Sequence, residues 1–163
     1  MAAKIAGCDP IVAVDIHDHR LDLARELGAT HAINHRSSTD VVAEIRNIAS
    51  GGVRHAVETS AVPAVLREAV ECLMPAATCV LLGSARKGTD VALEMPFIQQ
   101  GRMVRGVVQG DSLPQVFIPK LVDLIMTGKF PIEKMIAFYD FADIERAAKE
   151  SAAGTVIKPV LRP

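Results

Sequence analysis

Short apolar runs alternate with longer amphipathic stretches over the first 83 residues. The apolar runs lie at 9–16, 30–34, 54–59 and 77–83. The first follows a proline and is apolar on both faces, which is typical of a central strand of a parallel sheet. Strands that alternate with helices at this spacing predict an α/β fold, with a parallel sheet covered by helices on both faces.

The intervening stretches have helical spacing. Leu21, Ala24 and Leu27 share one face of a predicted helix over 19–28, and Asp18 is its expected N-cap. Further helices are predicted from about residue 39 and over 62–74, with Pro63 near the first turn. The opening residues 1–8 read as the end of a helix. Since no capping residue precedes it, we expect further sequence upstream.

The regular alternation of short apolar runs and amphipathic stretches ends after residue 83. A loop is followed by a short predicted strand at 91–95 and by another strand within 97–110. A long amphipathic helix, kinked near Pro119, is expected over 113–130, and residues 135–163 read as strand, helix and strand. We therefore expect two units, residues 1–108 and residues 109–163.

Composition excludes several classes of protein. The 18 basic and 19 acidic side chains sum to −1, with one Tyr and no Trp, so a nucleic-acid partner is not expected. No apolar run is long enough to span a bilayer, and no secretion signal opens the chain. Cys8, Cys72 and Cys79 form no CxxC pair, which argues against a structural zinc site and fits reduced thiols. We expect a cytoplasmic protein.

Asp15 is the most informative single residue. A carboxylate at the end of the second strand of a dinucleotide-binding fold accepts hydrogen bonds from the adenosine ribose and repels the extra phosphate of NADP. The alternative is an ordinary Asp that ends a strand and begins a turn. The strand–helix–strand context favours the cofactor role, with NAD as the cofactor, although His17, His19 and Arg20 leave room for NADP.

The glycine fingerprint that should precede Asp15 does not occur. It is expected roughly 20 residues upstream, before the first residue of the chain, and no GxGxxG occurs anywhere. The fold class is therefore an incomplete Rossmann-type doubly wound parallel sheet without its first strand and glycine loop, plus a C-terminal α+β appendage. In the strand order 3-2-1-4-5-6 that strand is central. We hypothesise that its neighbours, 11–15 and 55–59, close on each other, or that another chain supplies the missing edge.

Other candidate sites are weaker. Of the five histidines, at 17, 19, 31, 35 and 55, His17 and His19 lie together in a predicted turn with no matching cysteine or carboxylate cluster nearby. We expect them to be exposed loop residues and expect no metal site. The serines at 60, 84 and 112 lack a nucleophile-elbow context. The basic turn 85–88 is interpreted as solvated.

The chain resembles the zinc-dependent medium-chain alcohol dehydrogenases, and most closely the aryl-alcohol (benzyl-alcohol) group. The resemblance covers essentially all 163 residues and is carried by segments 10–34, 51–60, 79–88, 100–136 and 154–161. The string GDSLPQVFIPKLVDL followed by GKFP is the most specific to the aryl-alcohol group.

This resemblance implies a set of cofactor-binding residues. Asp15 and Arg20 would contact the adenosine ribose, and Thr59 and Ser60 would border the adenosine half of the site. The remaining matches are to the nicotinamide half, to its carboxamide and to the pyrophosphate: Leu82, Gly83 and Ser84; Val107 and Gln109; and Lys158.

The chain departs from the family pattern at the catalytic zinc. The family's zinc ligands lie upstream of the glycine loop, and none of the three cysteines matches them. The resemblance therefore implies the cofactor-binding part of an NAD- and zinc-dependent enzyme that oxidises aryl primary alcohols to aldehydes, with this chain inactive alone. It also implies a homo-oligomer through the edge strand Arg102–Gln109. The rival interpretation is a non-catalytic oligomerising or nucleotide-binding module.

Overall fold

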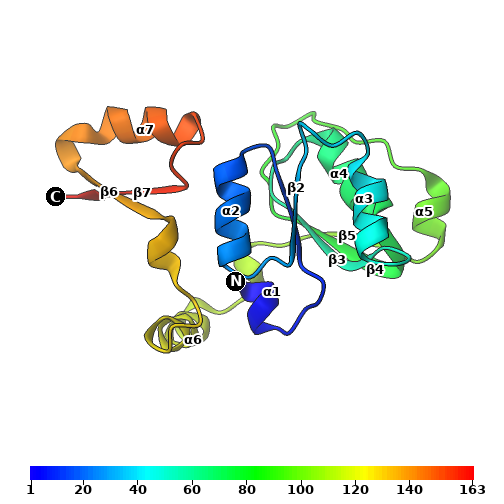
Figure 1. The fold of residues 1–163 in the computed structure, drawn as a ribbon, viewed down its shortest axis with the longest axis horizontal. Helices are drawn as coiled ribbons and strands as arrows, with labels where there is room; N and C mark the ends of the chain where they lie inside the picture. The colour runs from blue at the N-terminus through cyan, green and yellow to red at the C-terminus, as the bar shows by residue number, and fades with distance from the viewer.

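The computed structural model describes residues 1–163 as parallel β-pairs and helices in α/β alternation (Figure 1). The strands are β1 (Val12–Asp15), β2 (His31–Asn34), β3 (Val53–Glu58), β4 (Leu73–Leu81), β5 (Met103–Gly106), β6 (Ile136–Asp140) and β7 (Lys158–Arg162). They form three sheets in the orders β1-β2, β3-β4-β5 and β6-β7, and every pairing is parallel. The predicted α/β class is confirmed.

The helices follow the predicted sequence order, with one additional helix at 95–99. They are α1 (Ala2–Ile5), α2 (Asp18–Glu26), α3 (Val41–Ile48), α4 (Pro63–Glu71), α5 (Met95–Gln99), α6 (Pro114–Met126) and α7 (Ile144–Ala152). Short 3-10 turns occur at Gln109–Asp111, Ile132–Met135 and Phe141–Asp143. None of the helices has the length and apolar character needed to cross a membrane.

Three local expectations were wrong. The N-cap of α2 is His17, and the Asp18 carboxylate instead accepts a hydrogen bond from the Asn34 amide at 2.6 Å. Helix α4 ends at Glu71 because its last predicted residues begin β4. Residues 91–94 form no strand, and the 95–99 segment is helical. The Asn34 contact accounts for the first difference, and the start of β4 accounts for the second.

The sheet is interrupted between β1 and β3, where the missing central strand was predicted. These two strands belong to different sheets and do not pair. The hypothesis that they close on each other was therefore wrong. The carbonyl of Ile11 accepts hydrogen bonds from Thr30 and His31, and that of Asp15 accepts from His35, just beyond the end of β2. The carbonyl of Glu58 accepts from the segment after β4. Since bonding alternates along a parallel strand, the backbone groups of Val14 and Val57 point away from the existing partners.

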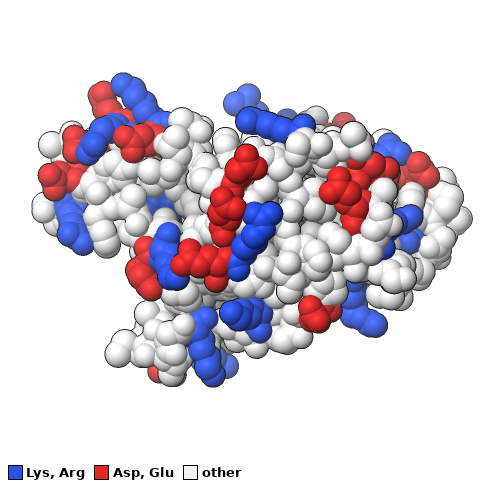
Figure 2. Space-filling view, viewed as in Figure 1, with Lys and Arg blue, Asp and Glu red and all other residues white.

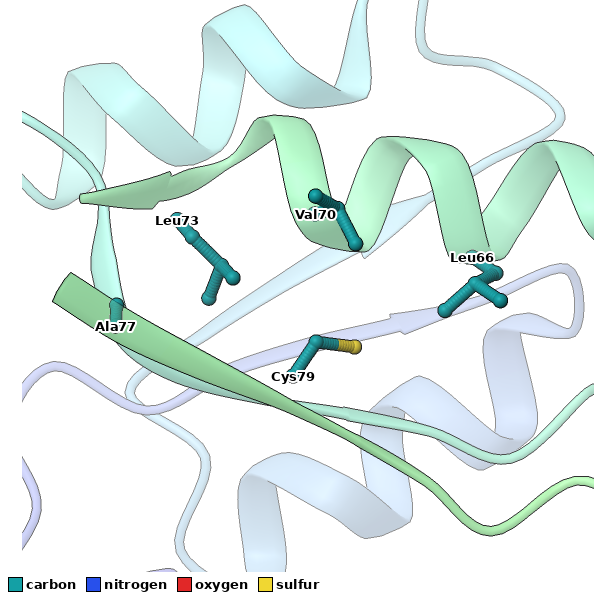
Figure 3. Packing of buried hydrophobic residues seen from close by; sticks show 5 residues of the cluster. All are labelled: Leu66, Val70, Leu73, Ala77 and Cys79. Carbon is teal, nitrogen blue, oxygen red and sulfur yellow. The ribbon is translucent and has the colours of Figure 1, made fainter. Parts of the chain in front are cut away.

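The core is small and lies against α3 and α4. Leu66 and Val70 point from α4 toward β4, where they pack on Leu73, Ala77 and Cys79 (Figure 3). A second cluster joins α3 to β2 through Ile33, Val41, Ile45 and Cys72. Only 16 of the 163 residues are buried, and many large apolar side chains outside these two clusters are exposed.

The β6-β7 pair and α7 lie to one side of the other strands and helices (Figure 1). Helix α7 packs on the β6-β7 pair, whereas α6 has no buried residue. Charged side chains of both signs are interspersed on the face seen in Figure 2, consistent with the net charge of −1. We find no patch of a single sign on that face that would attract a polyanion.

Candidate functional site

Asp15 is the last residue of β1 and is held in a fixed orientation. Its Oδ1 accepts hydrogen bonds from the backbone amides of Ile16 at 2.7 Å and His17 at 2.9 Å. The side chain is 30% exposed, so it is neither buried nor free in bulk solvent. A carboxylate in this place can accept further hydrogen bonds from a ligand hydroxyl at the carboxyl end of a parallel strand.

Arg20 lies between Asp15 and Gly154. Its Nη1 lies 3.8 Å from the Asp15 Oδ2, and its Nη2 donates to the Gly154 carbonyl at 3.2 Å. The His19 Nε2 lies 3.1 Å from the same carbonyl oxygen. The Arg20 Nε is buried and has no hydrogen-bond partner. Residues 134 positions apart in the sequence thus meet beside the Asp15 carboxylate.

Thr59 and Ser60 lie in the loop that follows β3. This loop is shaped by Glu58, a buried carboxylate that the sequence analysis did not single out. Glu58 accepts hydrogen bonds from the amides of Ser60 at 2.6 Å and Ala61 at 3.1 Å, and also from the Ser60 hydroxyl. The sequence offered one signal for Glu58: it is an acidic residue near the end of a predicted buried strand, where a charge needs compensating partners.

Leu82, Gly83 and Ser84 follow β4 and lie against the same loop. The amides of Leu82 and Gly83 donate to the Glu58 carbonyl at 2.8 and 3.2 Å. A Cβ added at Gly83 would come within 2.4 Å of the Ala61 nitrogen. The structure therefore brings Ser60, Leu82 and Gly83 together around Glu58, at the carboxyl ends of β3 and β4.

The other three predicted residues are not joined to this group. Val107 follows β5, Gln109 begins a 3-10 turn with a φ of 49°, and Lys158 is the exposed first residue of β7, paired with Ile136. No hydrogen bond or ion pair connects these residues to the loops after β1, β3 or β4. Their assignment to a common site remains a prediction.

A further polar hollow of about 570 Å³ opens between α3, α4 and α5. Its lining includes His35, whose Nε2 lies 2.9 Å from the Glu68 carboxylate. None of the predicted cofactor-binding residues lines it. We interpret it as a polar surface depression. His35 and Glu68 already contact each other, and the predicted cofactor-binding residues lie elsewhere.

The family's zinc is not matched by the side chains present. No group of three or more His, Cys, Asp or Glu residues is placed to hold a metal ion. The rings of His17 and His19 lie 5.5 Å apart without a third ligand. The donor set of this chain therefore does not fit a catalytic zinc.

Comparison with known proteins gives one consistent family. The model of the family described as zinc-binding dehydrogenase matches residues 1–127. Geraniol dehydrogenase of Castellaniella defragrans is 33% identical over 162 residues, which cover 99% of this chain and 43% of that protein.

Two solved structures agree closely with the fold. A zinc-binding-domain alcohol dehydrogenase protein from Burkholderia ambifaria is 44% identical, with a TM-score of 0.95, over 99% of this chain and 44% of that one. Benzyl alcohol dehydrogenase of Acinetobacter calcoaceticus is 39% identical, also with a TM-score of 0.95, over 98% and 44%. The chain thus spans less than half the length of these relatives, and it belongs to the zinc-binding dehydrogenase family.

Proposed function

We propose that this chain is the NAD-binding part of a zinc-type alcohol dehydrogenase that oxidises aryl primary alcohols to aldehydes. The observation that carries the proposal is the Asp15 carboxylate, oriented by two backbone amides at the end of a parallel strand. The 3.8 Å approach of Arg20 supports it, because a cation beside the carboxylate can contact the same ribose.

The chemistry divides between this chain and residues outside it. Oxidation of an alcohol transfers a hydride to the nicotinamide and releases a proton, and a zinc ion in such enzymes polarises the alcohol oxygen. Since no side-chain cluster here can hold the metal, the proposal assigns the zinc ligands to residues outside 1–163. The residues of this chain hold and orient the dinucleotide, and we expect the chain alone to be inactive.

The aryl-alcohol substrate class is supported by identity. The chain is 39% identical to a benzyl alcohol dehydrogenase and 33% identical to a geraniol dehydrogenase. The test is reduction of NAD by a longer dehydrogenase that contains this chain, assayed with benzyl alcohol, geraniol and ethanol. Benzyl alcohol should give the highest kcat/KM, and a preference for ethanol would contradict the substrate class.

Cofactor binding is tested directly on this chain. Calorimetric titration should give tighter binding of NAD than of NADP. Asp15→Ser should weaken NAD binding about tenfold, because hydrogen bonds from the ribose to a charged acceptor are lost, and should narrow the preference over NADP. Asp22→Ser is the matched control, since this carboxylate lies on the exposed side of α2 and contacts only Arg25. An unchanged preference for NAD over NADP in Asp15→Ser would contradict the assignment of Asp15 as the ribose-binding residue.

A further inference from the structure

Glu58 is one of two charged residues that are buried in this chain, with 2% of its surface exposed. It is the last residue of β3. A buried carboxylate is retained only when hydrogen bonds compensate its lost hydration. The groups that donate hydrogen bonds to Glu58 therefore indicate which part of the structure this residue orders.

No Lys or Arg pairs with this carboxylate. Its oxygens accept from the Ser60 amide at 2.6 Å, the Ala61 amide at 3.1 Å and the Ser60 hydroxyl. These donors immediately precede α4, whose N-cap is Val62. The positive end of the α4 dipole and three hydrogen bonds thus stabilise the negative charge. Every one of these interactions fixes the loop after β3.

The backbone of the same residue fixes the loop after β4. The Glu58 carbonyl accepts from both Leu82 and Gly83, at 2.8 and 3.2 Å. The two loops are further locked by the approach of Gly83 to Ala61, which leaves no room for a Cβ atom. Ala61 itself has a φ of 58°, an unfavourable conformation that its surroundings must maintain.

We propose that Glu58 is a positioning residue for the dinucleotide. It touches no cofactor itself but holds Ser60 and Gly83, on two different loops, in the arrangement that receives one. This inference rests on the proposed function. Loop geometry matters for binding because contacts to a ligand are lost when the groups that make them are misplaced by about 1 Å.

The substitution that tests the role is Glu58→Gln. The side chain keeps its size, but one acceptor oxygen becomes an NH₂ donor that must face the amide of Ser60 or Ala61. Two donors cannot bond to each other, so the loop must move. We expect NAD binding to weaken about tenfold or more, because the displaced loops misplace the groups that contact the ligand. Glu58→Asp keeps the charge and both acceptor oxygens and should recover part of this loss.

The matched control is Arg102→Gln, at the other buried charge. Arg102 donates to the Leu73 carbonyl at 2.9 and 2.8 Å, at the amino-terminal ends of β4 and β5 and away from both loops. Its loss should lower the free energy of unfolding without changing the NAD dissociation constant of the folded chain. A purely structural role for Glu58 predicts the same behaviour in Glu58→Gln.

The experiment is NAD titration of the unmodified chain and the three variants, with folding checked by circular dichroism. Weaker binding in folded Glu58→Gln, partial recovery in Glu58→Asp and unchanged binding in Arg102→Gln support the inference. Equal NAD affinity in the unmodified chain and Glu58→Gln overturns it. If Glu58→Gln does not fold, Glu58→Asp decides, and affinity equal to that of the unmodified chain overturns the inference. An unmodified chain that binds no NAD overturns the proposed function first, and the inference with it.

Discussion

Gly83 lies so close to Ala61 that a Cβ atom on the glycine would come within 2.4 Å of the alanine nitrogen and 2.9 Å of its Cα. Both contacts are to backbone, which cannot rotate away as a flexible side chain can. The loops after β3 and β4 are therefore in direct contact, and this contact requires glycine for its lack of a side chain.

Gly83→Ala should destabilise the chain by about 1–3 kcal/mol, because the added methyl forces one of the two loops to shift. Thermal unfolding followed by circular dichroism measures the change. Gly106→Ala is the matched control, since a Cβ at Gly106 would meet nothing within 4 Å. Equal unfolding midpoints for the two variants would show that the loops separate easily.

The buried thiols should be unreactive. Burial raises the pKa of Cys72 to about 11. Burial, together with a smaller effect of the nearby Glu58 carboxylate, raises the pKa of Cys79 to about 11. At pH 8 only about one buried thiol in a thousand is then the reactive thiolate. Cys8 is exposed. Dithiobis(nitrobenzoate) should therefore label one thiol rapidly and the other two only on unfolding, and rapid labelling of all three would contradict this core.

The same pKa shifts set a pH dependence. Both thiols have an ordinary pKa of 9.0, so between about pH 9 and pH 11 the folded chain keeps protons that the unfolded chain releases. The free energy of unfolding should be insensitive to these groups below about pH 9 and should fall as pH rises toward 11. Urea unfolding at several pH values measures this, and replacing both cysteines by alanine should reduce the slope.

The interruption between β1 and β3 should be visible in hydrogen exchange. The amides of Val14 and Val57 point away from their strands' partners, whereas those of Ala13 and Ala56 point toward them. We expect the first pair to exchange more than about tenfold faster. Protection of Val14 and Val57 equal to that of their neighbours would mean that another chain fills the gap, which is the alternative left open by the sequence.

Association through β5 is a separate prediction. This strand is one of the two edge strands of its sheet, and Met103 and Val104 are 55% and 39% exposed. An exposed apolar edge favours pairing with another chain. Sedimentation at micromolar concentration should show a dimer or larger assembly. Val104→Lys should shift it to monomer, and Ile5→Lys, on the exposed α1, should not. A monomeric unmodified chain would contradict the prediction.

Local patterns in the sequence determined the order and type of most elements. The short, β-branched apolar run ending at Asp15 is typical of a buried strand, and the apolar stripe containing Ile45 has the period of a helix with one buried face. The apolar pattern placed Asp15 at the end of a strand, and the expected spacing to Asp15 showed that the glycine loop does not occur in the chain. The elements depend on neighbours a few residues apart, and the glycine loop is expected at a fixed distance in sequence from Asp15. Both can therefore be recognised from the order of the residues alone.

The tertiary structure alone decided which distant residues meet. In the sequence, Glu58 is distinguished only as a charge at the end of an apolar strand. Its proposed positioning role comes from its hydrogen bonds with Ser60 and with the amide of Gly83, which lies 25 positions later. The contact of Arg20 with Gly154 likewise joins residues that no local pattern relates. Hydrogen bonds and steric fit between loops act through space, and periodicity along the chain carries no record of them.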